Sequence, residues 1–348
     1  MGAKQIKRTA LLISALIIVV INSCGEGITE PQPGRRDYVW TVDTLITHFN
    51  TIQDMWGNSN NNIYVVGPGG EGDDRIWHYD GKKWNKIVKY APPGIKAIYG
   101  FSNSNIWFSG FDGNIYNFDG TNWELNFTYK PQKSFHSIII TDIYGNSPSE
   151  IYAVGVTFYD ESNTQRGFVL KYNGVDWKEI YEANYNSQFL NIRKDKDKVM
   201  IFGIKSGFNE RVDTLVFWQL SNNNLREIYS SSADKITFAN FSQIGNDHYY
   251  IIGKDINRYE NDKFIKVMSI TEPNFAYAVF GRSEKDFFVN MIDGLAHYNG
   301  TNIEYLYKFK YPFTYLLHEP FISENEVFYI LYEAPTELNL ILHGKLKE

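Results

Sequence analysis

The stretch Tyr79-Asp80-Gly81-Lys82-Lys83-Trp84 decides the fold of this chain, because it is repeated. It returns as Phe118-Asp119-Gly120-Thr121-Asn122-Trp123 and again as Tyr172-Asn173-Gly174-Val175-Asp176-Trp177. Each copy consists of an aromatic residue, an Asp-Gly or Asn-Gly turn, two further residues and a Trp. Such a turn between hydrophobic runs is a strong signal for a β-hairpin. We therefore predict a chain built from one hairpin that is used repeatedly.

The repeated acidic residue of this hairpin invites a catalytic interpretation, but a structural role explains it better. Asp and Asn before Gly form turns, and degenerate copies of the hairpin carry Glu260 and Asn299 at this place. Asn can replace Asp in a turn, but it cannot replace a catalytic carboxylate. We therefore assign a structural role to the turn and anchor residues Trp40, Trp84, Trp123, Trp177, Asp80, Gly81, Asp119, Gly120, Asn173 and Gly174.

Each repeat is predicted to contain four strands. The first ends in an aromatic residue followed by Gly, as at Trp56-Gly57 and Tyr99-Gly100. The second is a compact apolar run, as at residues 63–67 and 106–110. Short runs of this kind, rich in β-branched and aromatic residues, are typical of strands buried on both faces. The third strand runs into the turn, and the fourth carries the Trp.

The fourth-strand anchors lie 39 to 54 residues apart, about the size of one blade of a β-propeller. These anchors are Trp40, Trp84, Trp123, Trp177, Leu225, Phe264 and Ile303. After Ile303 the chain supplies three more strands within residues 313–344, whereas residues 37–45 form an orphan strand around Trp40. Pairing the two ends closes a ring without an open edge. We predict an all-β fold, a seven-bladed β-propeller of four-stranded blades closed by pairing the N-terminal strand with three C-terminal strands.

Residues 1–23 have the features of an export signal. Positive residues at positions 4, 7 and 8 precede an uncharged, mostly aliphatic run over residues 10–21. As a helix this run would reach about 18 Å, too short for a hydrocarbon core of about 30 Å. The following Ile21-Asn22-Ser23-Cys24 resembles a bacterial lipobox. The resemblance implies a lipoprotein signal peptide, cleavage before Cys24 and lipid attachment at Cys24; the alternative is an ordinary secretory signal with an incidental Cys.

The rest of the chain is predicted to comprise a tether and one domain. Residues 24–36 are rich in Gly, Pro and acidic residues that cannot pack a core, so they are expected to be a flexible tether. Residues 37–348 form the propeller domain. Cys24 is the single cysteine, so no internal disulfide is expected. A lipid at Cys24 would anchor the protein to a membrane of the bacterial cell envelope, facing the periplasm or the cell surface.

The blades resemble those of bacterial lipoprotein β-propellers, in the broad group with WD-, Kelch- and Asp-box-type repeats. The resemblance covers about residues 37–347 and implies a fold rather than a reaction. The turns at Asp80 and Asp119 lie where Asp-box propellers place their own Asp turn. However, no copy reads Asp-x-Gly-x-Thr-Trp, ends in Trp-Asp or carries the paired glycines of Kelch units. The resemblance therefore transfers no catalytic residue to this chain.

We expect a binding site on the face where second and third strands are joined, because long loops on a rigid scaffold often carry function. The loops of the third and fourth blades, residues 156–167 and 204–214, are long and neighbouring. The candidate binding residues in these loops are Tyr159, Asp160, Glu161, Arg166, Phe208, Glu210 and Arg211. The alternative is that both loops are tolerated surface insertions.

The sequence contains none of the common catalytic or cofactor motifs. Its seven His are scattered without metal-ligand spacing, and there is neither a Gly-x-Ser-x-Gly elbow nor a phosphate loop. His78 and His297 occupy the same third-strand place in their blades, which indicates blade packing. A formal charge of −6 without clustered Lys/Arg argues against nucleic-acid binding. We expect no cofactor, no metal and no catalytic residue.

The leading hypothesis is a lipid-anchored extracytoplasmic β-propeller that acts as a binding or scaffold module for an unknown protein or glycan partner. One alternative is an enzyme acting on polysaccharides, a lyase or a glycosidase, with its site at the central channel. Two carboxylates facing one cleft would favour glycoside hydrolysis, whereas exposed aromatics on a flat face would favour binding. Another alternative is a purely structural surface lipoprotein.

Overall fold

The computed structural model describes residues 32–47, 51–67, 69, 75–87, 92–160, 164–195, 197–206, 213–231 and 238–348. Every regular element in these ranges is a β-strand. The strands belong to one compact unit, Pro33–Glu348. Within the described part of the chain, no helix has the length and apolar character needed to span a membrane. The predicted signal peptide and Cys24 lie outside the described residues.

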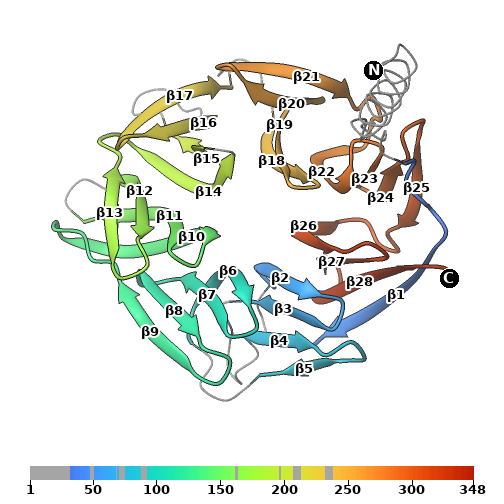
Figure 1. Cartoon of the computed structure of the whole chain (residues 1–348), viewed down its shortest axis with the longest axis horizontal. Coiled ribbons are helices and arrows are strands. Elements are labelled where there is room, and N and C mark those ends of the chain that lie inside the picture. Colours follow the sequence, from blue (N-terminus) through green and yellow to red (C-terminus); the bar gives the residue numbers. More distant parts are fainter. Residues whose placement is uncertain are drawn as a thin grey trace, which may run out of the picture. The chain divides into compact units, whose positions relative to one another are not determined.

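The sheet topology is that of a β-propeller, with blades arranged around a central axis (Figure 1). Five sheets have four strands each, and another has eight because a short parallel pairing joins two blades. That pairing connects Gln243 to Phe280 and Ile244 to Gly281. When the eight-stranded sheet is counted as two blades, the described strands form seven blades of four strands, which confirms the predicted architecture.

Within each blade the chain runs from the axis outward (Figure 1). The innermost strands of blades 1 to 7 are β2 (Asp54–Ser59), β6 (Ile95–Ser102), β10 (Phe135–Ser147), β14 (Ser187–Asp195), β18 (Ala239–Ile244), β22 (Phe275–Ser283) and β26 (Thr314–Ile322). The second strands are β3 (Asn62–Val66), β7 (Asn105–Gly110), β11 (Glu150–Tyr159), β15 (Lys198–Lys205), β19 (Asp247–Ile252), β23 (Asp286–Met291) and β27 (Glu326–Glu333). As predicted, the second strands are buried along most of their length.

The third and outermost strands form the repeated hairpin. The third strands are β4 (Ile76–Tyr79), β8 (Asn114–Phe118), β12 (Gln165–Tyr172), β16 (Thr214–Ser221), β20 (Asp255–Glu260), β24 (Gly294–Tyr298) and β28 (Leu338–Leu346). The outermost strands are β5 (Trp84–Lys86), β9 (Trp123–Thr128), β13 (Trp177–Glu182), β17 (Asn224–Ser230), β21 (Lys263–Ser269), β25 (Ile303–Lys308) and β1 (Tyr38–Leu45). We call the face where the inner strands begin the entry face. It also carries the links between blades and the connections between second and third strands.

The turn of each hairpin is held by its own side chain. The Asp80 Oδ1 atom accepts hydrogen bonds from the backbone N–H groups of Lys82 and Lys83, at 2.9 and 3.0 Å. Asp119, Asn173 and Asn299 accept the equivalent pairs in their own blades. The following glycines, Gly81, Gly120, Gly174 and Gly300, have φ angles between 89° and 97°, where a Cβ would be strained. The predicted structural role of Asp80 and Asp119 is therefore confirmed.

Adjacent inner strands pack through an aromatic residue on one blade and a glycine on the next. A Cβ atom on Gly100 would lie 2.6 Å from the ring of Trp56, and one on Gly145 would lie 2.2 Å from the ring of Phe101. Glycine is therefore required where the neighbouring ring approaches the backbone. This packing explains the glycine at positions 100 and 145 and the aromatic residue at Trp56.

The two ends of the chain close the ring in one blade. Strand β1 pairs antiparallel with β28 along its full length, from Tyr38 opposite Leu346 to Leu45 opposite Asn339. Trp40 covers Gly344, where a Cβ would lie 2.5 Å from its ring. This pairing confirms the predicted closure, because blade 7 takes three strands from the C-terminus and one from the N-terminus.

We expect Trp40→Ala to destabilise the whole domain, because the seventh blade loses the side chain that seals its outermost strand. The loss should be about 2–4 kcal/mol in free energy of unfolding. Val39→Ala is the matched control, since Val39 is adjacent on the same strand and 53% exposed. Its effect should stay within about 0.5 kcal/mol. Urea denaturation measures both; equal effects of the two substitutions would contradict the sealing role of Trp40.

Candidate functional site

The central channel of the ring contains two cavities. The entry chamber has a volume of about 440 Å³ and is lined near the start of the inner strands, for example by Gln53, Lys96 and Thr314. The far chamber has a volume of about 470 Å³ and is lined toward their ends, for example by Trp56 and Tyr144. Both chambers are lined by Asp54, Asp142, Arg193 and Glu319. These four residues therefore lie at the boundary between the chambers.

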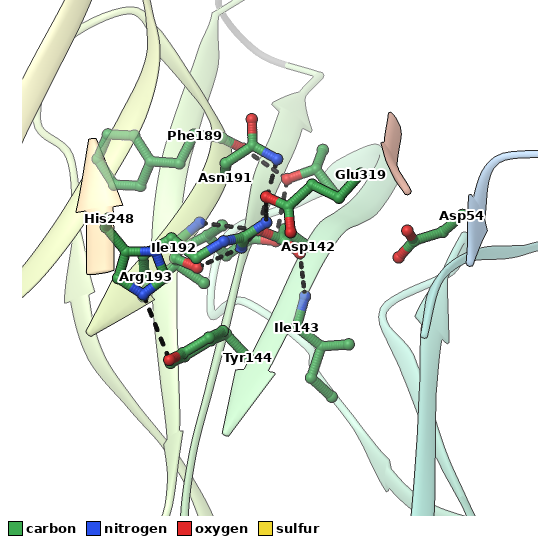
Figure 2. A network of polar contacts seen from close by, with 12 residues as sticks. Asp54, Asp142, Ile143, Tyr144, Phe189, Asn191, Ile192, Arg193, His248 and Glu319 are labelled. Carbon is green, nitrogen blue, oxygen red and sulfur yellow. Dashed lines mark hydrogen bonds and ion pairs between the residues drawn. The ribbon is translucent and has the colours of Figure 1, made fainter. Parts of the chain in front are cut away.

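An ion-pair cluster spans the channel at this boundary. The Arg193 guanidinium on β14 donates to the Asp142 carboxylate on β10 at 2.6 Å and to the Glu319 carboxylate on β26. Strand β26 belongs to blade 7, across the ring from blades 3 and 4. Figure 2 shows Arg193 between the two carboxylates. Each buried charge thus has an opposite charge in hydrogen-bond contact, as burial requires.

Glu319 reaches the channel because β26 departs from regular pairing. Leu317 pairs with Ile330 and Phe321 pairs with Phe328, so three residues of β26 oppose one residue of β27. The bulged segment begins at His318, whose φ is 56°, and includes Pro320, which has no N–H for the ladder. A bulge re-aims side chains, and here it brings Glu319 to Arg193.

The inner strand of blade 6 has the same irregularity. Phe275 pairs with Met291 and Val279 with Val289, so residues 276–278 oppose Asn290 alone. Tyr277 lies in this segment with a φ of 58°. Non-glycine residues in this conformation cluster at functional sites, and both bulges face the entry chamber.

Two carboxylates also tie neighbouring inner strands together. Asp142 accepts the backbone N–H of Ile192 on the next blade at 2.9 Å, and Asp54 accepts that of Ile98 at 3.0 Å. Burial raises the pKa of Asp54 to about 8; the Ile98 N–H opposes this shift and the Asp142 charge adds to it. Asp54 is therefore mostly protonated at neutral pH. Figure 2 shows its side chain pointing from β2 toward the cluster.

The entry chamber has a polar side and a side of mixed polarity. Blades 1 to 4 contribute polar side chains, among them Gln53, Lys96, Thr141 and Asn191. Blades 5 to 7 contribute both apolar residues, among them Ala276 and Leu316, and polar residues, among them Asn240, Thr314 and His318. Such a mixture of apolar surface and a few polar groups is typical of ligand pockets, and the volume lies in their usual range of about 300–1,000 Å³.

The far chamber is lined by polar side chains, such as Gln243 and Asn246, and by aromatic rings. Tyr144 packs beside Tyr99 with ring centroids 5.1 Å apart, and its hydroxyl contacts the His248 Nε2 atom at 3.4 Å (Figure 2). The Arg193 guanidinium lies 5.5 Å from the Tyr144 ring centroid. Burial, together with the Arg193 charge, lowers the pKa of His248 to about 4. His248 is therefore neutral at physiological pH.

The entry face carries a concentration of exposed apolar side chains. Of the thirteen large hydrophobic residues that are exposed in the described chain, seven lie on this face. They are Ile46, Phe111, Phe238, Ile292, Phe313, Tyr315 and Leu338, which we call the apolar rim. Ile292 and Tyr315 also line the entry chamber. Of the remaining exposed hydrophobic residues, Val175 lies on the opposite face and five lie on outermost strands. The entry face is therefore the face with the most exposed apolar side chains.

The structure brings together only part of the candidate site predicted from the sequence. Tyr159 is 4% exposed, its hydroxyl donates to Glu182, and the Arg166 guanidinium lies 5.5 Å from its ring centroid. Asp160 accepts a hydrogen bond from the Ser134 hydroxyl at 2.5 Å. Tyr159 and Arg166 thus lie on β11 and β12 rather than in a long loop, and these contacts hold them and Asp160 to their own blade. Glu161, Phe208, Glu210 and Arg211 lie outside the described residues.

The channel residues were missed by sequence reasoning, although a signal for them was present. Asp54 and Asp142 interrupt the otherwise apolar first strands of their blades. A carboxylate there is costly unless it is hydrogen-bonded or paired. That signal points to both Asp residues, but not to their partners.

The histidines of the third strands pack within their blades. The His78 ring stacks on Tyr64 at 4.5 Å, and its Nε2 atom contacts the Asn62 amide oxygen at 2.8 Å. His297 makes the equivalent contact with Asp286 at 2.8 Å. Among the residues that the structure describes, no group of His, Cys, Asp and Glu side chains is arranged to hold a metal ion.

Comparison with known proteins identifies the fold but no family. No family model matches the sequence, and no curated protein matches it either. Solved structures do match. A catalytically inactive virginiamycin B lyase from Staphylococcus aureus, crystallised with quinupristin, has a TM-score of 0.63 at 11% identity, covering 89% of this chain and 100% of that one. An oligogalacturonate lyase from Vibrio parahaemolyticus has a TM-score of 0.61 at 9% identity, covering 91% and 99%.

A third similar structure is YCF48 bound to D1 peptide, with a TM-score of 0.56 at 12% identity, covering 92% of this chain and 100% of that one. The shared feature is the propeller fold. At these identities the similarity shows architecture alone, so the function has to be argued from the channel and the entry face.

We expect Asp54→Asn to change how stability depends on pH. The folded-state pKa of Asp54, about 8, lies above its pKa in the unfolded chain. At pH values between the two, Asp54 is protonated in the folded state and ionised in the unfolded state. The wild-type protein therefore loses free energy of unfolding from this residue as pH rises from 5 to 8. The amide of the variant cannot titrate. The difference in free energy of unfolding between the wild type and the variant should therefore change by at least about 1 kcal/mol from pH 5 to pH 8. Urea denaturation at both pH values measures it, and parallel pH profiles would contradict the assignment.

Proposed function

We propose that this chain is a lipid-anchored binding module of the bacterial cell envelope, and that a protein partner docks on its entry face. The observation that carries the proposal is the apolar rim, which places seven exposed large hydrophobic side chains on the face that opens into the entry chamber. A face that carries most of the exposed apolar side chains of a protein is a candidate interaction surface. Aromatic side chains are enriched at the centres of protein interfaces, and four of the seven rim residues are aromatic.

The composition of the rim favours a protein over a glycan. Ile46, Ile292 and Leu338 are 65%, 64% and 37% exposed and offer a ligand neither a hydrogen bond nor a ring. A polyhydroxylated sugar gains little from such side chains, whereas a protein partner buries its own apolar side chains against them. Lipid attachment at Cys24 would hold this face in the envelope, where such a partner is met.

A polysaccharide-active enzyme is the second candidate, and one observation favours it. Asp54 lines the entry chamber and holds a proton at neutral pH, as a general acid must. Asp142 and Glu319, however, are both bound to Arg193. Neither is therefore available as a nucleophile or base in the described channel, and the geometry supports binding better than glycoside hydrolysis.

Docking on the entry face predicts that rim substitutions weaken partner binding. We expect the double substitution Ile292→Ser and Phe313→Ser to reduce recovery of the cross-linked partner from native envelopes at least about tenfold, the effect of losing one binding hot spot. Leu125→Ser with Ile265→Ser is the matched control, because these residues are 55% and 48% exposed on outermost strands. Quantitative mass spectrometry of the cross-linked products compares the two proteins. Equal recovery with both would refute docking on this face.

Lipid anchoring predicts a simple change in fractionation. Cys24→Ser should move the protein from the membrane fraction to the soluble fraction, because no acyl chain can then be attached. The melting temperature should not change, since Cys24 precedes the propeller domain. Fractionation followed by mass spectrometry of the N-terminal peptide gives the readout. A Cys24→Ser protein that stays in the membrane fraction would contradict lipidation at this residue.

A further inference from the structure

A short segment, residues 34–37, contacts blade 6 before the chain enters β1, and we call it the N-terminal clip. The Arg36 guanidinium donates to the His297 carbonyl at 2.8 Å and to the Asn302 amide oxygen at 2.9 Å. It also pairs with the Glu304 carboxylate at 2.8 Å. The Arg36 side chain is 16% exposed, so the blade covers most of it.

The backbone of the clip also approaches blade 6 closely. The Gly34 N–H donates to the Lys285 carbonyl at 2.9 Å. A Cβ atom on Gly34 would lie 2.5 Å from the Asp286 carboxylate, so the close approach requires glycine. The Asp37 carbonyl accepts the N–H of Lys347 at 3.1 Å, which continues the pairing of β1 with β28. The clip therefore links blade 6 to the closing strand of blade 7, and the chain passes beside β25 before β1 begins (Figure 1).

The clip lies on the face opposite the entry face, which we call the exit face. This face carries the turns between first and second strands and between third and outermost strands. Lys285 lies in the turn between β22 and β23, and Asn302 lies in the turn between β24 and β25. Strand β1 also begins at this face, since Tyr38 is opposite Leu346 at the end of β28. The chain thus reaches the propeller from the exit face.

The exit face is polar. Its turns consist mainly of Asn, Asp, Ser, Gly and Lys, as at residues 58–61, 103–104 and 299–302. Of the large hydrophobic side chains that are exposed in the described chain, Val175 alone lies on this face. Polar groups lose free energy when they are buried without partners, so this surface can lie against hydrated lipid headgroups but not insert into hydrocarbon.

The chain between Cys24 and the clip is short. Gly34 follows Cys24 by ten residues, which span at most about 33–36 Å when fully extended. The composition of this stretch predicts a flexible tether, for which the average reach over ten residues is about 16–19 Å. By comparison, the eight residues of β1 span about 26 Å from the exit face to the entry face. The average reach of the tether is therefore shorter than the height of a blade.

We infer that the short tether holds the protein with its exit face toward the headgroups of its own membrane, so that the apolar rim faces away from that membrane. This inference rests on lipid attachment at Cys24 in the proposed function and adds the orientation in which docking occurs. The partner is then a water-soluble protein domain that approaches from the aqueous side.

The alternative occupant of the apolar rim is the bilayer itself, because apolar side chains on one face can bind a membrane interface. For the rim to reach the membrane that holds Cys24, the tether would have to run along the whole height of blade 6 near its full extension. A chain held so extended loses conformational entropy. Contact through the polar exit face has no such cost, so the observations favour a protein partner at the rim.

Energy transfer measures which face lies near the membrane. The full-length lipidated protein is reconstituted in phosphatidylethanolamine–phosphatidylglycerol liposomes that carry an acceptor dye on their headgroups. Thr301→Cys places a donor dye on the exit face of blade 6, and Ile292→Cys places it on the entry face of the same blade. Cys24 is the single native cysteine and its sulfur would carry the lipid, so only the introduced thiol reacts. We expect at least about twofold more efficient transfer from position 301, because the six residues of β23 separate the two faces by about 20 Å.

A longer tether tests whether tether length sets the orientation. Inserting about 40 Gly and Ser residues between Pro31 and Gln32 raises the average reach to about 35–42 Å, more than the height of a blade. The difference between the two positions should then disappear, and a difference that survives would overturn the role of the tether. In the protein with the native tether, equal transfer from both positions would overturn the inference. More efficient transfer from position 292 would also overturn it and would identify the bilayer as the occupant of the rim.

Two outcomes separate this inference from the proposed function. If Cys24 carries lipid by mass spectrometry but both positions transfer equally, anchoring holds and the orientation alone is wrong. If Cys24 carries no lipid, anchoring is wrong and the orientation is overturned with it. Cross-linking with the rim double substitution reports on docking at the entry face in both cases.

Discussion

The pairing of β1 with β28 is the constraint on which the rest of the structure depends. It joins the two ends of the domain in one blade and completes the seventh four-stranded sheet. Because blade 7 is built from both ends, its inner strand β26 is held across the ring from β10 and β14. Only in a closed ring can Glu319 of β26 reach Arg193 of β14, so the charge cluster of the channel depends on a contact at the outer edge of the seventh blade.

The channel shows how the fold accommodates charge in its interior. The Arg193 and Asp142 side chains are largely removed from water, and their attraction offsets that cost because Asp142 contacts the guanidinium; Glu319, which is 34% exposed, contacts the same guanidinium. Asp54 has no ion-pair partner in this cluster. Burial keeps it protonated, and its oxygens accept hydrogen bonds from backbone N–H groups. The cluster also divides the channel, so a ligand that enters from the entry face meets a polar floor rather than an open pore.

The proposed binding site consists of departures from the repeat. The Asp-Gly turns, the anchors and the aromatic–glycine contacts recur from blade to blade and build the scaffold. By contrast, bulges in which three residues oppose one occur in β22 and β26, and Asn290 and Glu319 line the channel at these places. The apolar rim likewise lies on one face, in links and loops and at the first residues of β26 and β28. A repeated scaffold can tolerate such local changes because each blade is stabilised mainly by its own strands and its two neighbours.

The sequence by itself determined the strands, the hairpin turns, the number of blades and the ring closure, because these follow from local patterns that recur along the chain. Asp80, Gly81 and Trp84 act within a few residues of one another, and Trp40 is found by extending the same spacing. Only the tertiary structure decided the site. Lys96, Arg193, Asn290 and Glu319 lie on different blades, and they share one channel because seven inner strands converge on an axis. No local pattern records that convergence, and the two bulges at Asn290 and Glu319 are set by strand register, which arises from pairing rather than from sequence spacing.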